Sequence, residues 1–208
     1  MKRYFYIPVV MTAALMLSTF AGCQKDEDSL DTQRTSTERF LESSHQPRLM
    51  SEEAARESLD ENPEYYTSYD NKTYRYIATM YAEGRDAWPE IGEGDLVAIY
   101  FNAYVFSYSA ITGSTMPYWS NYAEVIAALE QTAGHLDPEY WSSEPLIVRA
   151  GGSDALDGVS RALVGCRVGD NVEVYMTYAA AYGKNIVGLV PKESPVAWMI
   201  TIVDVSKQ

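Results

Sequence analysis

The feature of this chain that most constrains its fold is a series of short segments rich in aromatic and β-branched residues, the composition of β-strands. Glycine, proline and short helical stretches separate these segments, without the regular alternation of strand and helix that builds a parallel sheet. The segments span residues 73–81, 96–106, 146–149, 171–178 and 196–205. Their order predicts an α+β domain with a mainly antiparallel sheet.

Apolar side chains alternate along the last two of these segments, as they do in strands with one buried face. Val172 and Val174 share one face of the segment 171–178. Trp198, Ile200 and Ile202 share one face of the segment 196–205. These side chains are therefore predicted to point into the core of the domain.

Three helices are predicted between and before the strands. Ser51 is a suitable N-cap for a helix over residues 51–59, because acidic residues follow it in the first turn, where the helix dipole favours them. Apolar residues at helical spacing predict a second helix over residues 121–133, and Gly134 is a natural stop for it. A third, short helix is expected over residues 157–164.

The N-terminal residues have the pattern of a secretory signal, which is removed from the mature protein. A basic pair precedes an uncharged and mostly apolar run over residues 4–20. The four residues from Phe20 to Cys23 resemble a bacterial lipobox, a motif whose cysteine becomes the acylated N-terminus. We expect residues 1–22 to be a signal peptide and Cys23 to carry the lipid; an ordinary secretory peptide is the alternative.

The polar stretch behind this motif predicts where the protein resides. Residues 24–28 resemble the signal that directs Bacteroidetes lipoproteins to the outer face of the outer membrane, and a solvated tether is the alternative. We expect an exported protein that a lipid anchors to the outer membrane, on its periplasmic or its outward-facing side. Residues 23–48 are predicted to be a flexible tether, because few apolar residues are present to offset the entropy of ordering. Residues 49–71 are predicted to be a partly helical N-terminal extension.

Composition excludes several classes of function. The formal net charge of −13 argues against nucleic-acid binding, which needs concentrated Lys and Arg. The two cysteines, Cys23 and Cys166, provide no disulfide framework if the first is acylated, so we expect Cys166 to pack unreactive in the core. His45 and His135 are far apart in sequence, and no Cys/His cluster has metal-ligand spacing. No metal and no cofactor are expected.

The C-terminal half contains glycine-bearing motifs in a distinctive order. A short apolar strand ends at Gly151, and Leu156 then precedes the short helix. A glycine-containing turn follows at residues 164–170, and the next strand leads to the Ala-Tyr-Gly tripeptide at residues 181–183. A Gly-Leu-Val-Pro loop at residues 188–191 precedes the last strand.

The order and spacing of these motifs resemble the FKBP-type peptidyl-prolyl cis–trans isomerase family over about residues 72–206. The resemblance implies an FKBP-like domain over residues 72–208, in which a twisted antiparallel half-barrel sheet wraps a short helix. An extra helical insertion is expected at about residues 118–142. The implied function is that of a peptidyl-prolyl cis–trans isomerase or folding helper at the cell envelope, acting on proline-containing peptides or proteins.

Such an isomerase would need neither a nucleophile nor a metal. Resonance opposes rotation about a peptide bond with a barrier of roughly 18–20 kcal/mol. Before proline the cis and trans forms are close in energy, but they exchange only over roughly tens of seconds. A pocket that grips the proline ring and favours the twisted amide over the planar one is sufficient for catalysis.

The resemblance also implies the residues of the pocket. Tyr182, Leu156 and Trp198 would be the catalytic residues, with the Tyr182 hydroxyl and the Leu156 backbone N–H each holding a substrate carbonyl. The side chains that would bind the substrate are Phe101, Tyr118, Leu146, Val159, Leu189 and Val190.

Several of these positions depart from the family pattern. Val159 stands where the family usually has tryptophan, and Phe101 stands where it has tyrosine. The family's phenylalanine-aspartate pair corresponds to Tyr118 and Trp119, so its aspartate has no clear counterpart. Two alternatives therefore stay open. One is a non-catalytic FKBP-like module that binds a peptide or partner, and the other is glycan binding through the aromatic residues of the insertion.

Overall fold

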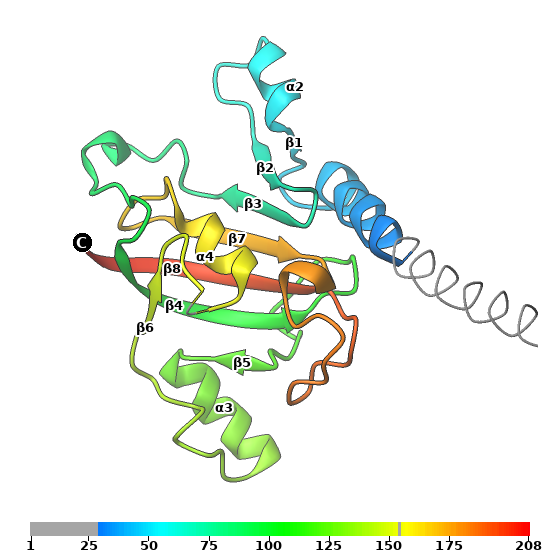
Figure 1. Ribbon diagram of the computed structural model, residues 1–208, viewed down its shortest axis with the longest axis vertical. Helices are drawn as coiled ribbons and strands as arrows, with labels where there is room; N and C mark the ends of the chain where they lie inside the picture. The colour runs from blue at the N-terminus through cyan, green and yellow to red at the C-terminus, as the bar shows by residue number, and fades with distance from the viewer. Residues whose placement is uncertain (1–28, 154) are drawn as a thin grey trace, which may run out of the picture.

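The computed structural model describes residues 29–153 and 155–208, so the predicted signal peptide and Cys23 lie outside the described residues. One sheet of eight strands dominates the fold (Figure 1). The strand order is β1-β2-β3-β7-β8-β4-β5, and β6 pairs with the free part of the β4 edge. Among the described strands only the β1–β2 pair is parallel, which confirms the predicted α+β class with a mainly antiparallel sheet.

Most of the helices and strands are short. In chain order the elements after the first helix are β1 (Met50–Ser51), α2 (Glu52–Glu57), β2 (Tyr65–Tyr69), β3 (Thr73–Ile77), the 3-10 helix η1 (Arg85–Ala87), β4 (Leu96–Val105), β5 (Trp119–Ser120), α3 (Ala123–Ala133), β6 (Leu146–Arg149), α4 (Asp157–Leu163), β7 (Asn171–Met176), the 3-10 helix η2 (Tyr178–Ala180) and β8 (Val196–Ser206). All three predicted helices and all five predicted strand segments are confirmed within a few residues. The sequence did not predict β1, β2 and β5.

The main core lies between one face of the sheet and α4. The two longest strands, β4 and β8, pair along their whole length, and alternation along them buries Val97, Ile99, Trp198 and Ile200. Gly158 allows α4 to pack tightly on the sheet, because a Cβ at this position would lie 2.6 Å from both the Met176 side chain and Thr73 Oγ1. The predicted packing of the sheet around a short helix therefore depends on this glycine.

A helix over residues 29–43, drawn in blue in Figure 1, packs on one end of the opposite face of the sheet. Phe40, Leu41 and Leu49 are buried in a second apolar cluster, together with aromatic side chains of β2, β3 and β7. The prediction of a flexible tether over residues 23–48 is therefore wrong for its described part, residues 29–48. Three well-placed apolar side chains are enough to dock this segment because the sheet offers them an aromatic surface.

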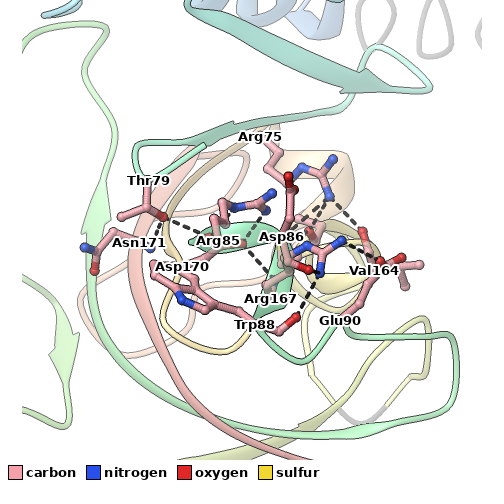
Figure 2. A network of polar contacts seen from close by, with 12 residues as sticks. Arg75, Thr79, Arg85, Asp86, Trp88, Glu90, Val164, Arg167, Asp170 and Asn171 are labelled. Carbon is pink, nitrogen blue, oxygen red and sulfur yellow. Dashed lines mark hydrogen bonds and ion pairs between the residues drawn. The ribbon is translucent and has the colours of Figure 1, made fainter. Parts of the chain in front are cut away.

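A network of polar contacts fastens one end of the sheet (Figure 2). The Asp170 carboxylate is fully buried and accepts both hydrogen bonds of the Arg85 guanidinium at 2.7 Å, together with one from Thr79 Oγ1 at 2.9 Å. Arg167 donates to the carbonyls of Asp86 and Trp88. These contacts tie the β3–β4 connection to the turn before β7, where Gly169 has a φ of 98°.

Among residues 29–153 and 155–208, no helix is both long enough and apolar enough to cross a membrane.

Candidate functional site

Three side chains from separate segments meet at the open end of the main core. Trp198 lies in β8, Tyr118 directly precedes β5, and Tyr182 follows η2. The Trp198 Nε1–H donates to the Tyr118 hydroxyl at 2.9 Å, and the Tyr118 and Tyr182 hydroxyl oxygens are 3.3 Å apart. The indole is fully buried, whereas both phenols are half-buried. Tyr118 therefore connects the buried indole with the phenol of Tyr182.

In the hydrogen-bonded series Trp198–Tyr118–Tyr182, one hydroxyl proton has no acceptor within the series. Trp198 has a donor only, while each phenol has one donor and acceptor lone pairs. Once Trp198 donates to Tyr118 and one phenol donates to the other, a single O–H remains for a further acceptor. Hydrogen bonds in such a series polarise one another, so the remaining phenolic O–H is a better donor than the O–H of an isolated phenol.

Both phenols stay protonated over the ordinary pH range. Burial raises the pKa of Tyr118 far above its usual value. Burial also raises the pKa of Tyr182, although the hydrogen bond with Tyr118 offsets part of the rise. The site therefore offers a neutral hydroxyl donor and has no negative charge at this point.

Beneath these hydroxyls lies a cluster of three aromatic rings. Phe101 stacks on Trp198 with ring centroids 4.3 Å apart and an angle of 14° between the planes. Trp119 meets both rings edge-on, at 4.7 Å from Phe101 and 5.6 Å from Trp198. The indole of Trp119 thus packs directly against Phe101. The contact is apolar on both sides.

Above the hydroxyls is an open cleft with a volume of about 690 Å³. Its lining comes from the β5 region, the loop after α3 and the loop after η2, and consists of Tyr118, Trp119, Leu136, Tyr140, Trp141, Tyr182, Val187, Gly188 and Leu189. None of these residues carries a charged side chain. The cleft therefore suits an apolar or aromatic group, with hydroxyls at one point to bind a carbonyl.

The Asn121 side chain holds the segment after β5 against the edge of β4. β5 covers only Asn102 and Ala103 of the β4 edge, so the backbone of Phe101 has no strand partner on that side. The Asn121 side chain takes this place, because its oxygen accepts from Phe101 N at 2.7 Å and its amide donates to the carbonyls of Ile99 and Glu144 at 3.0 Å. Trp119 Nε1 donates to the carbonyl of Tyr140 at 2.9 Å and fixes the outer wall of the cleft.

The predicted site residues fall into three groups. Tyr118, Tyr182 and Leu189 line the cleft. Leu146 and Leu156 are half-buried and pack against the main core without lining the cleft. The fully buried members form the support beneath it, and they are Phe101, Val159, Val190 and Trp198.

The backbone N–H of Leu156 is a hydrogen-bond donor at the start of α4. Leu156 is the N-cap of α4, and its carbonyl accepts from Ser160 N at 3.0 Å. None of the described residues accepts a hydrogen bond from the Leu156 N–H. This is the group that the resemblance assigns to a substrate carbonyl.

The aromatic residues expected in the insertion at about 118–142 only partly line the cleft. Tyr140 and Trp141 belong to its lining, together with Tyr118 and Trp119. Tyr122, from the same stretch, points elsewhere and donates to Thr201 Oγ1 at 2.9 Å. Leu136 and Val187 carry no sequence signal, because single apolar residues in loops are common.

Within residues 29–153 and 155–208, no group of three or more His, Cys, Asp or Glu side chains could hold a metal ion.

Residues 125–203 match the family of FKBP-type peptidyl-prolyl cis–trans isomerases. The matched segment covers less than half of the chain and runs from α3 to the last strand. It includes the glycine motifs that carry the resemblance. No curated protein matches this chain in sequence.

Several solved structures are similar to this one at low sequence identity. The N-terminal domain of FKBP42 from Arabidopsis thaliana is 13% identical, with a TM-score of 0.45, and the match covers 72% of this chain and 96% of that one. A peptidyl-prolyl cis–trans isomerase from Pseudomonas syringae is 14% identical, with a TM-score of 0.46, over 87% of this chain and 96% of that one. The three FKBP domains of wheat FKBP73 are 15% identical, with a TM-score of 0.49, over 70% of this chain and 52% of that one.

Proposed function

We propose that this protein is a peptidyl-prolyl cis–trans isomerase or folding helper whose site is the cleft over Tyr118 and Tyr182. The observation that carries the proposal is the hydrogen-bonded series Trp198–Tyr118–Tyr182, which leaves one O–H unused at an apolar cleft. The match of residues 125–203 to the isomerase family supports the same reading. The substrates would be proline-containing peptides or proteins.

The chemistry follows from what the cleft offers to an amide. A planar prolyl amide is strongly dipolar, and twisting it removes much of the charge separation. An apolar cleft therefore disfavours the planar form relative to the twisted one. The unused O–H of the tyrosine pair would hold a carbonyl that flanks the rotating bond. The resemblance adds the Leu156 N–H for a second carbonyl, although Leu156 does not line this cleft. Rotation then proceeds while the proline ring lies against the aromatic wall.

The direct test is proline-limited refolding of a model substrate with the purified chain. We expect the slow refolding phase to accelerate in proportion to the concentration of the added protein. Tyr182→Phe should lose most of the acceleration, whereas Tyr122→Phe should keep it because that hydroxyl bonds to Thr201 outside the cleft. No acceleration at micromolar protein would overturn the isomerase proposal.

The second candidate is an FKBP-like module that binds peptides without isomerising them. It is favoured by the apolar contact between Phe101 and Trp119, where the family pattern would place an aspartate. Trp119 and Trp141 line the cleft, so binding of a proline-containing peptide should change tryptophan fluorescence. Saturable binding with no effect on refolding would select this candidate. Sugar binding has less support, because the cleft lining offers few polar groups to pair with sugar hydroxyls.

We also propose that the protein is exported and anchored to the outer membrane through Cys23. The support is the sequence pattern of residues 1–28, which precede the described residues. Labelling cells with an alkynyl fatty acid should tag the protein, and Cys23→Ser should abolish the label. Digestion of intact cells with a protease would then distinguish an outward-facing protein, which is degraded, from a periplasmic one, which survives.

A further inference from the structure

The two ends of the loop that carries Tyr182 are joined through one side chain of the N-terminal helix. This site loop, residues 178–193, contributes four residues to the cleft: Tyr182, Val187, Gly188 and Leu189. Gln33, in the helix over residues 29–43, accepts a hydrogen bond at Oε1 from Tyr178 N at 2.9 Å. Its Nε2 donates to the carbonyl of Glu193 at 2.8 Å. Gln33 is only 7% exposed, so little water competes for these bonds.

Backbone hydrogen bonds complete the base of the site loop. Gly183 N donates to the Tyr178 carbonyl at 2.8 Å, and Glu193 N donates to the Gly183 carbonyl at 3.0 Å. Gln33 therefore contacts Tyr178 and Glu193, the two residues whose backbone groups also bond to Gly183, directly after Tyr182. The start of the loop and its end are fixed relative to each other and to the N-terminal helix (Figure 1).

We propose that Gln33 is a positioning residue that sets the place of Tyr182 in the cleft. The inference rests on the proposed isomerase function and deepens it. Gln33 is far from Tyr182 in sequence and does not line the cleft, so it acts through the loop backbone. A displacement of about 1 Å in a reacting group can cost as much as about 100-fold in rate, so the link is expected to matter for turnover.

Only an amide of this length satisfies both partners. Tyr178 N–H is a donor and needs an acceptor, while the Glu193 carbonyl is an acceptor and needs a donor. A glutamate keeps the length and the acceptor but places a second acceptor against the Glu193 carbonyl. A methionine keeps the approximate shape and removes both hydrogen bonds. The two substitutions therefore separate the loss of one bond from the loss of both.

The experiment compares Gln33→Met and Gln33→Glu with Leu41→Ala in the purified chain. Leu41 lies in the same helix and is fully buried, but its apolar cluster contains no residue of the site loop. All three variants are assayed well below their melting temperatures. We expect both Gln33 variants to lower kcat/KM for prolyl isomerisation by about tenfold or more. Leu41→Ala should lose stability and keep the activity of the unmodified chain.

Hydrogen exchange provides a readout that does not depend on activity. In Gln33→Met the amides of Tyr178, Gly183 and Glu193 should exchange faster, whereas in Leu41→Ala they should not. If the unmodified chain shows no isomerase activity, the proposed function fails while the exchange data still decide whether Gln33 holds the loop. Equal exchange in Gln33→Met and Leu41→Ala, or unchanged kcat/KM in an active Gln33→Met protein, would overturn the inference.

Discussion

The buried indole of Trp198 donates its N–H to the hydroxyl of Tyr118 at 2.9 Å, directly below the open cleft. The bond joins the last strand to the segment before β5, which are far apart in sequence. It satisfies the polar atom of a ring that is otherwise surrounded by apolar side chains. It also directs the Tyr118 hydroxyl toward Tyr182, and the following predictions test both consequences.

Tyr182→Phe should reduce catalysis and leave the fold intact. The substitution removes the hydroxyl that remains free when Tyr118 donates to Tyr182. Loss of one substrate hydrogen bond of about 1.4 kcal/mol lowers kcat/KM about tenfold. Refolding kinetics of a proline-containing substrate measure the effect, and the melting temperature serves as the control. Unchanged kcat/KM would show that this phenol is not used.

Tyr118→Phe should affect stability as well as catalysis. The buried Trp198 N–H would lose its acceptor, and an unsatisfied buried donor costs about 1–3 kcal/mol in unfolding free energy. Urea denaturation followed by tryptophan fluorescence measures this loss. Tyr122→Phe is the matched control, because that hydroxyl bonds to the partly exposed Thr201. If both variants are equally stable, the bond below the cleft contributes little.

Asp170→Ala should be among the most destabilising single changes in the chain. The carboxylate is fully buried and pairs with Arg85, so its removal leaves a largely buried guanidinium without its counter-ion. Breaking such a pair costs about 3–5 kcal/mol. Asp70→Ala removes an exposed partner of Arg161 and should leave the unfolding midpoint nearly unchanged. Chemical denaturation of both variants gives the comparison.

The docking of the N-terminal helix is expected to weaken at alkaline pH. Both ring nitrogens of His45 face acceptors, Glu173 Oε2 at 2.8 Å and the Pro47 carbonyl at 2.5 Å, so the protonated ring satisfies both contacts by donating from each nitrogen. Burial lowers the pKa of His45, but the bonds to Glu173 and Pro47 outweigh it, and the pKa is raised above 6.5. Glu64 also attracts the ring, and the neutral phenols of Tyr76 and Tyr175 pack against it.

A group with a raised pKa in the folded state stabilises the fold fully below its unfolded pKa and progressively less as the pH rises through the folded value. The unfolding free energy of the unmodified chain should therefore exceed that of His45→Gln by more at about pH 6 than at about pH 9. Denaturation at both pH values tests this. His135→Gln is the control, because that imidazole is 83% exposed. A difference that does not depend on pH would contradict a charged His45.

Cys166 should be unreactive until the protein unfolds. Burial raises the pKa of the thiol to about 11, so at about pH 8 only about one molecule in a thousand carries the nucleophilic thiolate. In a Cys23→Ser background Cys166 is the remaining thiol of the chain. Iodoacetamide should label it in denaturant but not in buffer. Rapid labelling of the folded chain would show that the core opens at this point.

The sequence predicted the main sheet well because alternation and glycine turns are local signals. Val174, Trp198 and Ile200 are buried on the same face of the sheet, as their spacing required. The helix over residues 29–43 was missed because its stabilisation is not local. Phe40 and Leu41 become sufficient only when the aromatic face of the folded sheet is present, and a window of polar sequence does not reveal that partner.

Three residues that the resemblance proposed for the site lie together in the structure. Tyr118, Tyr182 and Trp198 form one hydrogen-bonded series. The sequence could not show that Tyr118 covers the indole, so that Trp198 and Phe101 support the cleft from below. In that arrangement the ring of Trp119 packs edge-on against Phe101.

The domain expected over residues 72–208 packs against residues that precede it in the chain. Removing everything before residue 72 would expose Tyr74, Tyr76, Phe106 and Tyr175 to water, because the residues that shield them lie upstream. A fragment that begins at residue 72 should therefore self-associate through this aromatic surface.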